Sequence, residues 1–73
     1  MKQEELKKEV AKRMRFFRKL KDVSAKQMSL DIGKAEGYIS KVENGKLIPS
    51  LDTFAVIIRY LGISFDFFLK SNI

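Results

Sequence analysis

The chain has 73 residues, contains no cysteine and no histidine, and carries a formal net charge of +6. Without cysteine or histidine it can form no disulfide, no ordinary zinc site and no serine–histidine catalytic pair. A hydrophobic fraction of 45% and a charged fraction of 33% are typical of a small folded domain. Because such a short domain buries only ~60% of its unfolded surface, we expect association with a second copy to add stability.

The positive charge is concentrated at the start of the chain. Residues 1–21 hold nine Lys or Arg and three Glu, whereas residues 22–73 hold six basic and six acidic residues. The whole charge favours attraction to phosphate. The excess in residues 1–21 can contact DNA or form a solvated helix face, and we favour the solvated face.

Nothing in the sequence indicates a membrane protein. No apolar run approaches the ~20 residues that span a bilayer, and the charged start MKQEELKKEV is unlike a signal peptide. We expect a cytoplasmic protein encoded by a bacterium or a phage, with no cofactor, metal or small-molecule ligand.

The apolar period near the start predicts a helix over residues 3–21. Its expected buried stripe consists of Leu6, Val10, Met14, Phe17 and Leu20. Phe16 lies beside this stripe, so we expect it to be only partly covered.

Two short amphipathic segments separated by Gly33 predict helices over residues 24–32 and 36–44. Ser24 is a good N-cap, with Gln27 as its capping-box partner, and Gly33 ends the first segment in a left-handed conformation. The expected inward residues are Met28, Ile32, Ile39 and Val42, and Ser29 is small enough to let another helix cross closely.

Two further helices are predicted over residues 50–61 and 64–69, capped by Ser50 and Ser64. The expected buried face of the longer one consists of Leu51, Phe54, Ala55, Ile58 and Leu61. Phe65, Phe68 and Leu69 are expected to share the core, while the tail frays unless Ile73 docks. Five helices with short links indicate one all-α domain, residues 1–73.

The run YISKVENGK at residues 38–46, followed by PSL at 49–51, resembles the phage repressor/Cro-like (XRE-type) helix-turn-helix family. The resemblance extends over about residues 10–69. It implies a five-helix lambda-repressor-like DNA-binding domain, not an enzyme, whose motif occupies about residues 24–44. It also implies that residues 36–44 enter the major groove of double-stranded DNA.

The resemblance assigns candidate DNA contacts at the start of that helix and around it. The base-reading candidates are Glu36, Gly37, Ser40 and Lys41. The phosphate-contact candidates are Ser24, Ala25, Lys26, Tyr38, Asn44, Gly45 and Lys46.

Alternative roles exist for three of these residues. Glu36 can read cytosine, but phosphates repel a carboxylate, so we prefer an acid stabilised by the helix dipole. For Lys41 we favour a phosphate over a guanine, because phosphate contacts are the more numerous. Tyr38 is equally consistent with a DNA contact and a half-buried ring.

The resemblance further pairs Arg18 with Glu43, as a bidentate ion pair that fixes the reading helix. The chain also departs from the family pattern where polar residues are usual, and these departures weaken the expected grip on DNA. They are Ala25, Ala35, Leu47 and Ile48, with Lys34 at a position that is usually apolar.

The last predicted helix carries more apolar surface than a small domain hides, which favours a homodimer. The interface candidates are Ile57, Tyr60, Leu61, Ile63 and Phe67. We expect a transcriptional regulator, a repressor or autoregulator, that binds an inverted repeat as a dimer. The alternative is a protein-interaction module on the same scaffold, an antitoxin or phage accessory factor with weak DNA binding.

Overall fold

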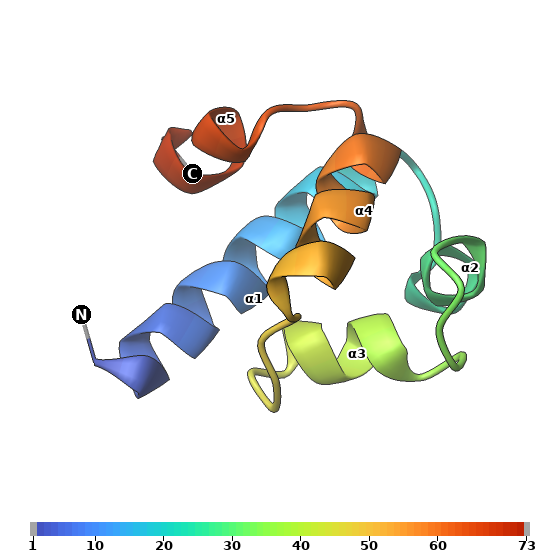
Figure 1. The fold of residues 1–73 in the computed structure, drawn as a ribbon, viewed down its shortest axis with the longest axis horizontal. Coiled ribbons are helices and arrows are strands. Elements are labelled where there is room, and N and C mark those ends of the chain that lie inside the picture. The colour runs from blue at the N-terminus through green and yellow to red at the C-terminus, as the bar shows by residue number, and fades with distance from the viewer. Residues whose placement is uncertain (1, 73) are drawn as a thin grey trace.

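The computed structural model describes residues 2–72, which form five helices and no strand (Figure 1). The helices are α1 (Gln3–Leu20), α2 (Ala25–Asp31), α3 (Tyr38–Glu43), α4 (Leu51–Leu61) and α5 (Phe65–Lys70). α3 packs against both α1 and α2, and α5 packs against α4. The all-helical fold was predicted correctly. Within residues 2–72, no helix has both the length and the hydropathy of a membrane span.

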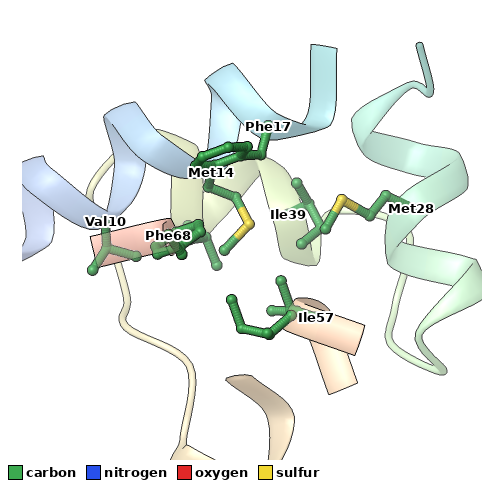
Figure 2. Packing of buried hydrophobic residues seen from close by; sticks show 9 residues of the cluster. Val10, Met14, Phe17, Met28, Ile39, Ile57 and Phe68 are labelled. Carbon is green, nitrogen blue, oxygen red and sulfur yellow. The ribbon is translucent and has the colours of Figure 1, made fainter. Parts of the chain in front are cut away.

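Side chains from all five helices meet in one core. Its buried members are Val10, Met14, Phe17, Met28, Ile39, Val42, Ile57, Ile58 and Phe68. Met14, Ile39, Met28 and Ile57 converge between the ribbons in Figure 2. Fully burying one such side chain stabilises a fold by ~1.5–3 kcal/mol relative to leaving it exposed. The two core residues of α3, Ile39 and Val42, are completely buried, so α3 is held from behind by the core.

The stripe on α1 is buried only in its middle. Val10, Met14 and Phe17 lie in the core as predicted, whereas Leu6 is partly exposed and Leu20 keeps 68% of its surface exposed. The 18 residues of α1 make a helix about 27 Å long, close to the longest extent of the molecule, 30 Å. α1 therefore spans nearly the whole length of the molecule.

The predicted inward faces of the last two helices were partly wrong. Leu51 is 80% exposed and Ala55 is exposed, whereas Ile57 is completely buried. α4 is apolar at most of its positions, so its period does not single out one face. In α5 only Phe68 is buried, because a helix of six residues presents little more than one position to the core.

The C-terminal end is tied to α1 rather than frayed. Arg13 Nη1 donates to the carbonyl oxygens of Phe68 at 3.0 Å and Ser71 at 2.8 Å, and also contacts Ser71 Oγ at 3.1 Å. One guanidinium thus supplies donors to carbonyls at the end of α5, where helical carbonyls lack partners. The predicted docking of Ile73 lies outside the described residues.

The serine caps follow the prediction at two of three helices. Ser24 Oγ accepts the N–H of Gln27, and Ser64 Oγ accepts the N–H of Phe67, each at 3.0 Å. Gln27 does not complete a capping box, since its side chain donates to Asp31 Oδ1 at 2.7 Å. Ser50 does not cap α4 with its hydroxyl.

A buried ion pair joins α1 to the end of α3. Arg18 Nε donates to Glu43 Oε2 at 2.6 Å, and Nη2 donates to Oε1 at 3.0 Å. The third nitrogen, Nη1, donates to the carbonyl of Val23 at 2.8 Å. The hydrogen bond with Glu43 raises the pKa of Arg18, and the Glu43 side chain is only 4% exposed. The pair expected from the resemblance is therefore present, with bidentate geometry.

Replacing Glu43 with Gln should lower the free energy of unfolding by about 3 kcal/mol, because Arg18 loses its charged partner at a buried site. Urea denaturation followed by circular dichroism measures this loss. The matched control is Glu36→Gln, which breaks an exposed ion pair between Glu36 and Lys26 (3.7 Å) and should cost less than about 1 kcal/mol. Equal losses in the two variants would contradict the structural role of Glu43.

A second polar contact ties α4 to α2. Tyr60 Oη donates to Asp31 Oδ2 at 2.7 Å, and the ammonium of Lys21 lies 4.9 Å from the centroid of the Tyr60 ring. Burial and the hydrogen bond to Asp31 raise the pKa of Tyr60 to about 12. The hydrogen bonds from Tyr60 and then Gln27 lower the pKa of Asp31.

The raised pKa of Tyr60 predicts a loss of stability in alkali. The unfolded chain releases this proton near pH ~10, whereas the folded chain keeps it until about pH 12. The contribution of Tyr60 is thus complete below pH ~10 and disappears as the pH rises through the folded pKa. Urea denaturation across this range should show a smaller decline for Tyr60→Phe than for the wild type. Parallel declines would contradict the assignment, and Asp31→Asn should make Tyr60 ionise at lower pH.

Candidate nucleic-acid interface

α3 begins two residues later than predicted. The helix starts at Tyr38, with Gly37 as an N-cap that has no side chain to bond the first turn. The N–H of Tyr38 donates to the carbonyl of Ala35 at 3.0 Å, so Glu36 and Gly37 form an exposed turn ahead of the helix. The predicted start at residue 36 was therefore wrong, and these two residues precede α3.

The outer side of α3 carries the other two base-reading candidates. Ser40 and Lys41 are exposed, whereas their neighbours Ile39 and Val42 are completely buried. Glu36 and Gly37 are exposed as well, in the turn that leads into α3. In Figure 1, α3 lies at one edge of the molecule, with its outer side turned away from α1 and α4.

Glu36 lies just before the N-cap of α3 and has a partner on α2. Its carboxylate lies 3.7 Å from the ammonium of Lys26, and both side chains are mostly exposed. Because Glu36 precedes α3, the first turn of α3 contains no acidic residue. An exposed ion pair is weak, so Lys26 can exchange this carboxylate for a phosphate at little cost.

Tyr38 is a half-buried residue with a polar end. Its ring packs against the core, and the ammonium of Lys34 lies 5.3 Å from the ring centroid. Burial, and secondarily the charge of Asp52, raise the pKa of Tyr38. The phenol stays protonated near neutral pH, so it can donate a hydrogen bond to an anion.

The remaining phosphate-contact candidates fall into two groups. Ser24, Ala25 and Lys26 lie at the start of α2, where Ser24 and Lys26 are exposed and Ala25 is half-buried. Asn44, Gly45 and Lys46 follow α3, where Asn44 and Lys46 are exposed and Gly45 adopts a left-handed φ of 70°. An open hollow of about 340 Å³ adjoins the first group, lined by Arg18, Lys19, Asp22, Val23 and Ser24.

The structure corrects the surface expected to contact a second copy. Ile57 is completely buried in the core, so it has no surface to offer a partner. Tyr60, Leu61 and Ile63 are half-buried, and Phe67 is 54% exposed with its ring centroid 5.7 Å from that of Phe17. The candidate surface without Ile57, which we call the α4–α5 surface, therefore consists of Tyr60, Leu61, Ile63 and Phe67.

Sequence reasoning did not predict two contacts between helices, although it expected Ser29 to be small enough for another helix to cross closely. Arg13 holds the end of α5, and the buried Ser29 of α2 bonds to α3. Neither had a periodic signal, although a small polar residue on the inward side of a helix is itself unusual.

Comparison with known proteins bears on this geometry. A family model described as "Helix-turn-helix" matches residues 14–68. The match begins within α1, includes all of α2, α3 and α4, and ends within α5. No curated protein and no solved structure matches the chain. The matching family consists of sequence-specific DNA-binding domains of transcription regulators and is not an enzyme family. The chain therefore belongs to the Cro/repressor-like (XRE-type) helix-turn-helix family.

Proposed function

We propose that the protein is a homodimeric transcription regulator that places α3 of each copy in the major groove of an inverted repeat. As a repressor or autoregulator, it would act by occupying a promoter. The observation that carries the proposal is the division of α3 into a buried side and an exposed side. Ile39, Val42 and Glu43 attach the helix to the domain, which leaves Ser40 and Lys41 available to DNA.

Within this proposal, Ser40 and Lys41 are the best-placed residues to contact DNA from α3. A serine hydroxyl can donate or accept at either type of base pair, and a lysine can donate to guanine O6 and N7 or to a phosphate. Glu36 and Gly37 meet the DNA from the turn before the helix. Lys26 partly neutralises Glu36, which reduces the repulsion that a phosphate would exert on its carboxylate.

Phosphate contacts from both sides would fix the register of α3. Lys26 at the start of α2 and Lys46 after α3 have exposed ammonium groups, and the half-buried Tyr38 can donate from its phenol. Such contacts position a domain on DNA without reading sequence.

The α4–α5 surface is the proposed dimer contact. Phe67 is more than half exposed although it is a large apolar residue next to the buried Phe68, and Leu61 and Ile63 lie a few residues before it in the chain. To bind an inverted repeat, a two-fold contact there has to hold the two copies of α3 about 34 Å apart, one turn of DNA.

A specific observation also favours the alternative, a protein-interaction module on this scaffold. Phe16 and Leu20 are exposed on α1, next to the basic residues that give the chain its net charge. Exposed apolar side chains with basic neighbours are suited to a protein partner. In this case DNA binding would be weak and secondary.

Selection of bound sequences from random DNA, followed by tests of Lys41→Ala on the preferred sequence, examines the DNA-binding proposal. A base contact predicts relaxed preference at one position with a loss of about 1–3 kcal/mol, whereas a phosphate contact predicts uniform weakening. Lys8→Ala, an exposed change on α1, is the matched control and should alter neither preference nor the response to salt beyond a small electrostatic effect.

Salt separates the two functions in the same experiment. A binder with several phosphate contacts should lose affinity steeply as salt rises, and Lys46→Ala should reduce the slope by about 1. Absence of any preferred sequence, together with a flat response to salt, would favour the interaction module.

The dimer proposal predicts that Phe67→Glu is monomeric in analytical ultracentrifugation, because a carboxylate in the centre of an apolar contact is left without a partner. Leu69→Glu is the matched control, since Leu69 is similarly exposed but lies about 200° around α5 from Phe67. Circular dichroism verifies that both variants are folded. An unchanged sedimentation coefficient for folded Phe67→Glu would remove the α4–α5 surface from the proposal.

A further inference from the structure

The N-terminus of α3 lacks a capping side chain of its own. Its N-cap is Gly37, and Ala35, which opens the preceding turn, also has no polar side chain. By contrast, α2 and α5 are each capped locally, by Ser24 and Ser64. The first N–H groups of any helix have no partner within the helix, so α3 needs an acceptor from elsewhere.

Ser29 of α2 supplies that acceptor. Its Oγ accepts the N–H of Ile39, the second residue of α3, at 2.9 Å, and donates to the carbonyl of Ala25 at 2.7 Å. Ser29 is completely buried, and so is the side chain of Ile39. The bond to Ala25 orients the hydroxyl, so that its lone pairs face α3.

We propose that Ser29 is a positioning residue for DNA recognition, because its bond to Ile39 fixes the N-terminal half of α3 at a set distance from α2. The inference rests on the proposed DNA-binding function. α3 is then attached at both ends to different helices, through Ser29 of α2 at its start and through Arg18 of α1 at its end. Two such attachments determine the tilt of α3 relative to the body of the domain.

The proposed base contacts follow directly from this bond. Ser40 and Lys41 are the next two residues after Ile39, so a shift of the Ile39 backbone moves both. A site held loosely by about 1 Å loses much of its function even when the fold survives. A residue that merely stabilised the domain would have no such effect on recognition.

The test replaces Ser29 with Ala, alone and together with Ala35→Ser. Ser29→Ala removes the acceptor, and amide exchange at Ile39 should become roughly 5–30-fold faster. A hydroxyl at residue 35 can reach the N–H of Tyr38, three residues on, but not that of Ile39, so Ala35→Ser stabilises the start of α3 without restoring the link to α2. If Ser29→Ala alone is too unstable to assay, the double variant still allows DNA binding to be compared with that of the wild type.

The decisive measurement is the ratio of affinity for the selected sequence to affinity for unrelated DNA of the same length. We expect this ratio to fall about fivefold or more in Ser29→Ala, the effect of one mismatched base pair, and to stay low in the double variant. Val10→Ala, a core change on α1, is the control that lowers stability while leaving the Ser29–Ile39 bond in place, and it should leave the ratio unchanged.

Two results would overturn the inference. One is an unchanged affinity ratio in folded Ser29→Ala, and the other is full recovery of the ratio when Ala35→Ser restores stability. If the wild type binds no duplex DNA, the proposed function fails instead. Amide exchange at Ile39 is measured without DNA, so an unchanged rate in Ser29→Ala would independently show that Ser29 does not cap α3.

Discussion

The attachment of α3 is the constraint on which the rest of this structure depends. A helix of six residues is far below the ~12–15 residues at which an isolated helix becomes marginally stable in water. α3 therefore exists only because the domain holds it, through the burial of Ile39 and Val42, the ion pair of Glu43 with Arg18, and the bond from Ile39 to Ser29. All of these attachments lie on one side of the helix. Ser40 and Lys41, on the opposite side, are exposed, which leaves them available for binding.

The Arg18–Glu43 pair contributes more to the orientation of α3 than to the net stability of the fold. Desolvating two charges costs nearly as much as their attraction returns, so a buried pair often contributes little net stability compared with apolar residues of similar volume. Its bidentate form and the third bond to Val23 instead join α1 both to the end of α3 and to the link before α2, through bonds that depend on direction. For a helix whose exposed residues are proposed to meet base edges, a fixed orientation is useful.

Where the sequence contains local signals, the structure follows them closely. α1 ends within one residue of the predicted position, and Ser24 and Ser64 cap their helices, because period and capping act between near neighbours in the chain. The start of α3 was predicted wrongly, since its capping acceptor is Ser29 of α2 and no neighbouring residue in the chain indicates where the helix begins. The inward face of α4 was misjudged because most of its positions are apolar. Arg13 binds Ser71 across 58 residues, a contact that no local pattern encodes. The candidate DNA residues were identified by resemblance, and the structure adds which of them precede α3 and which lie on it.

Because little of the net charge lies near α3, recognition of a DNA sequence would depend more on the position of α3 than it does in a domain with a strongly basic DNA-binding surface. The net charge resides in residues 1–21, whereas residues 22–73 contain equal numbers of acidic and basic groups, and Glu36 neutralises Lys26 beside the reading surface. Charge on α1 can attract DNA from a distance and raise the rate of encounter, but it cannot distinguish one sequence from another. Discrimination must then come from a few hydrogen bonds and from shape, whose strength depends steeply on distance and angle. A surface with little charge of its own therefore depends on how firmly Ser29 and Arg18 hold the helix that carries it.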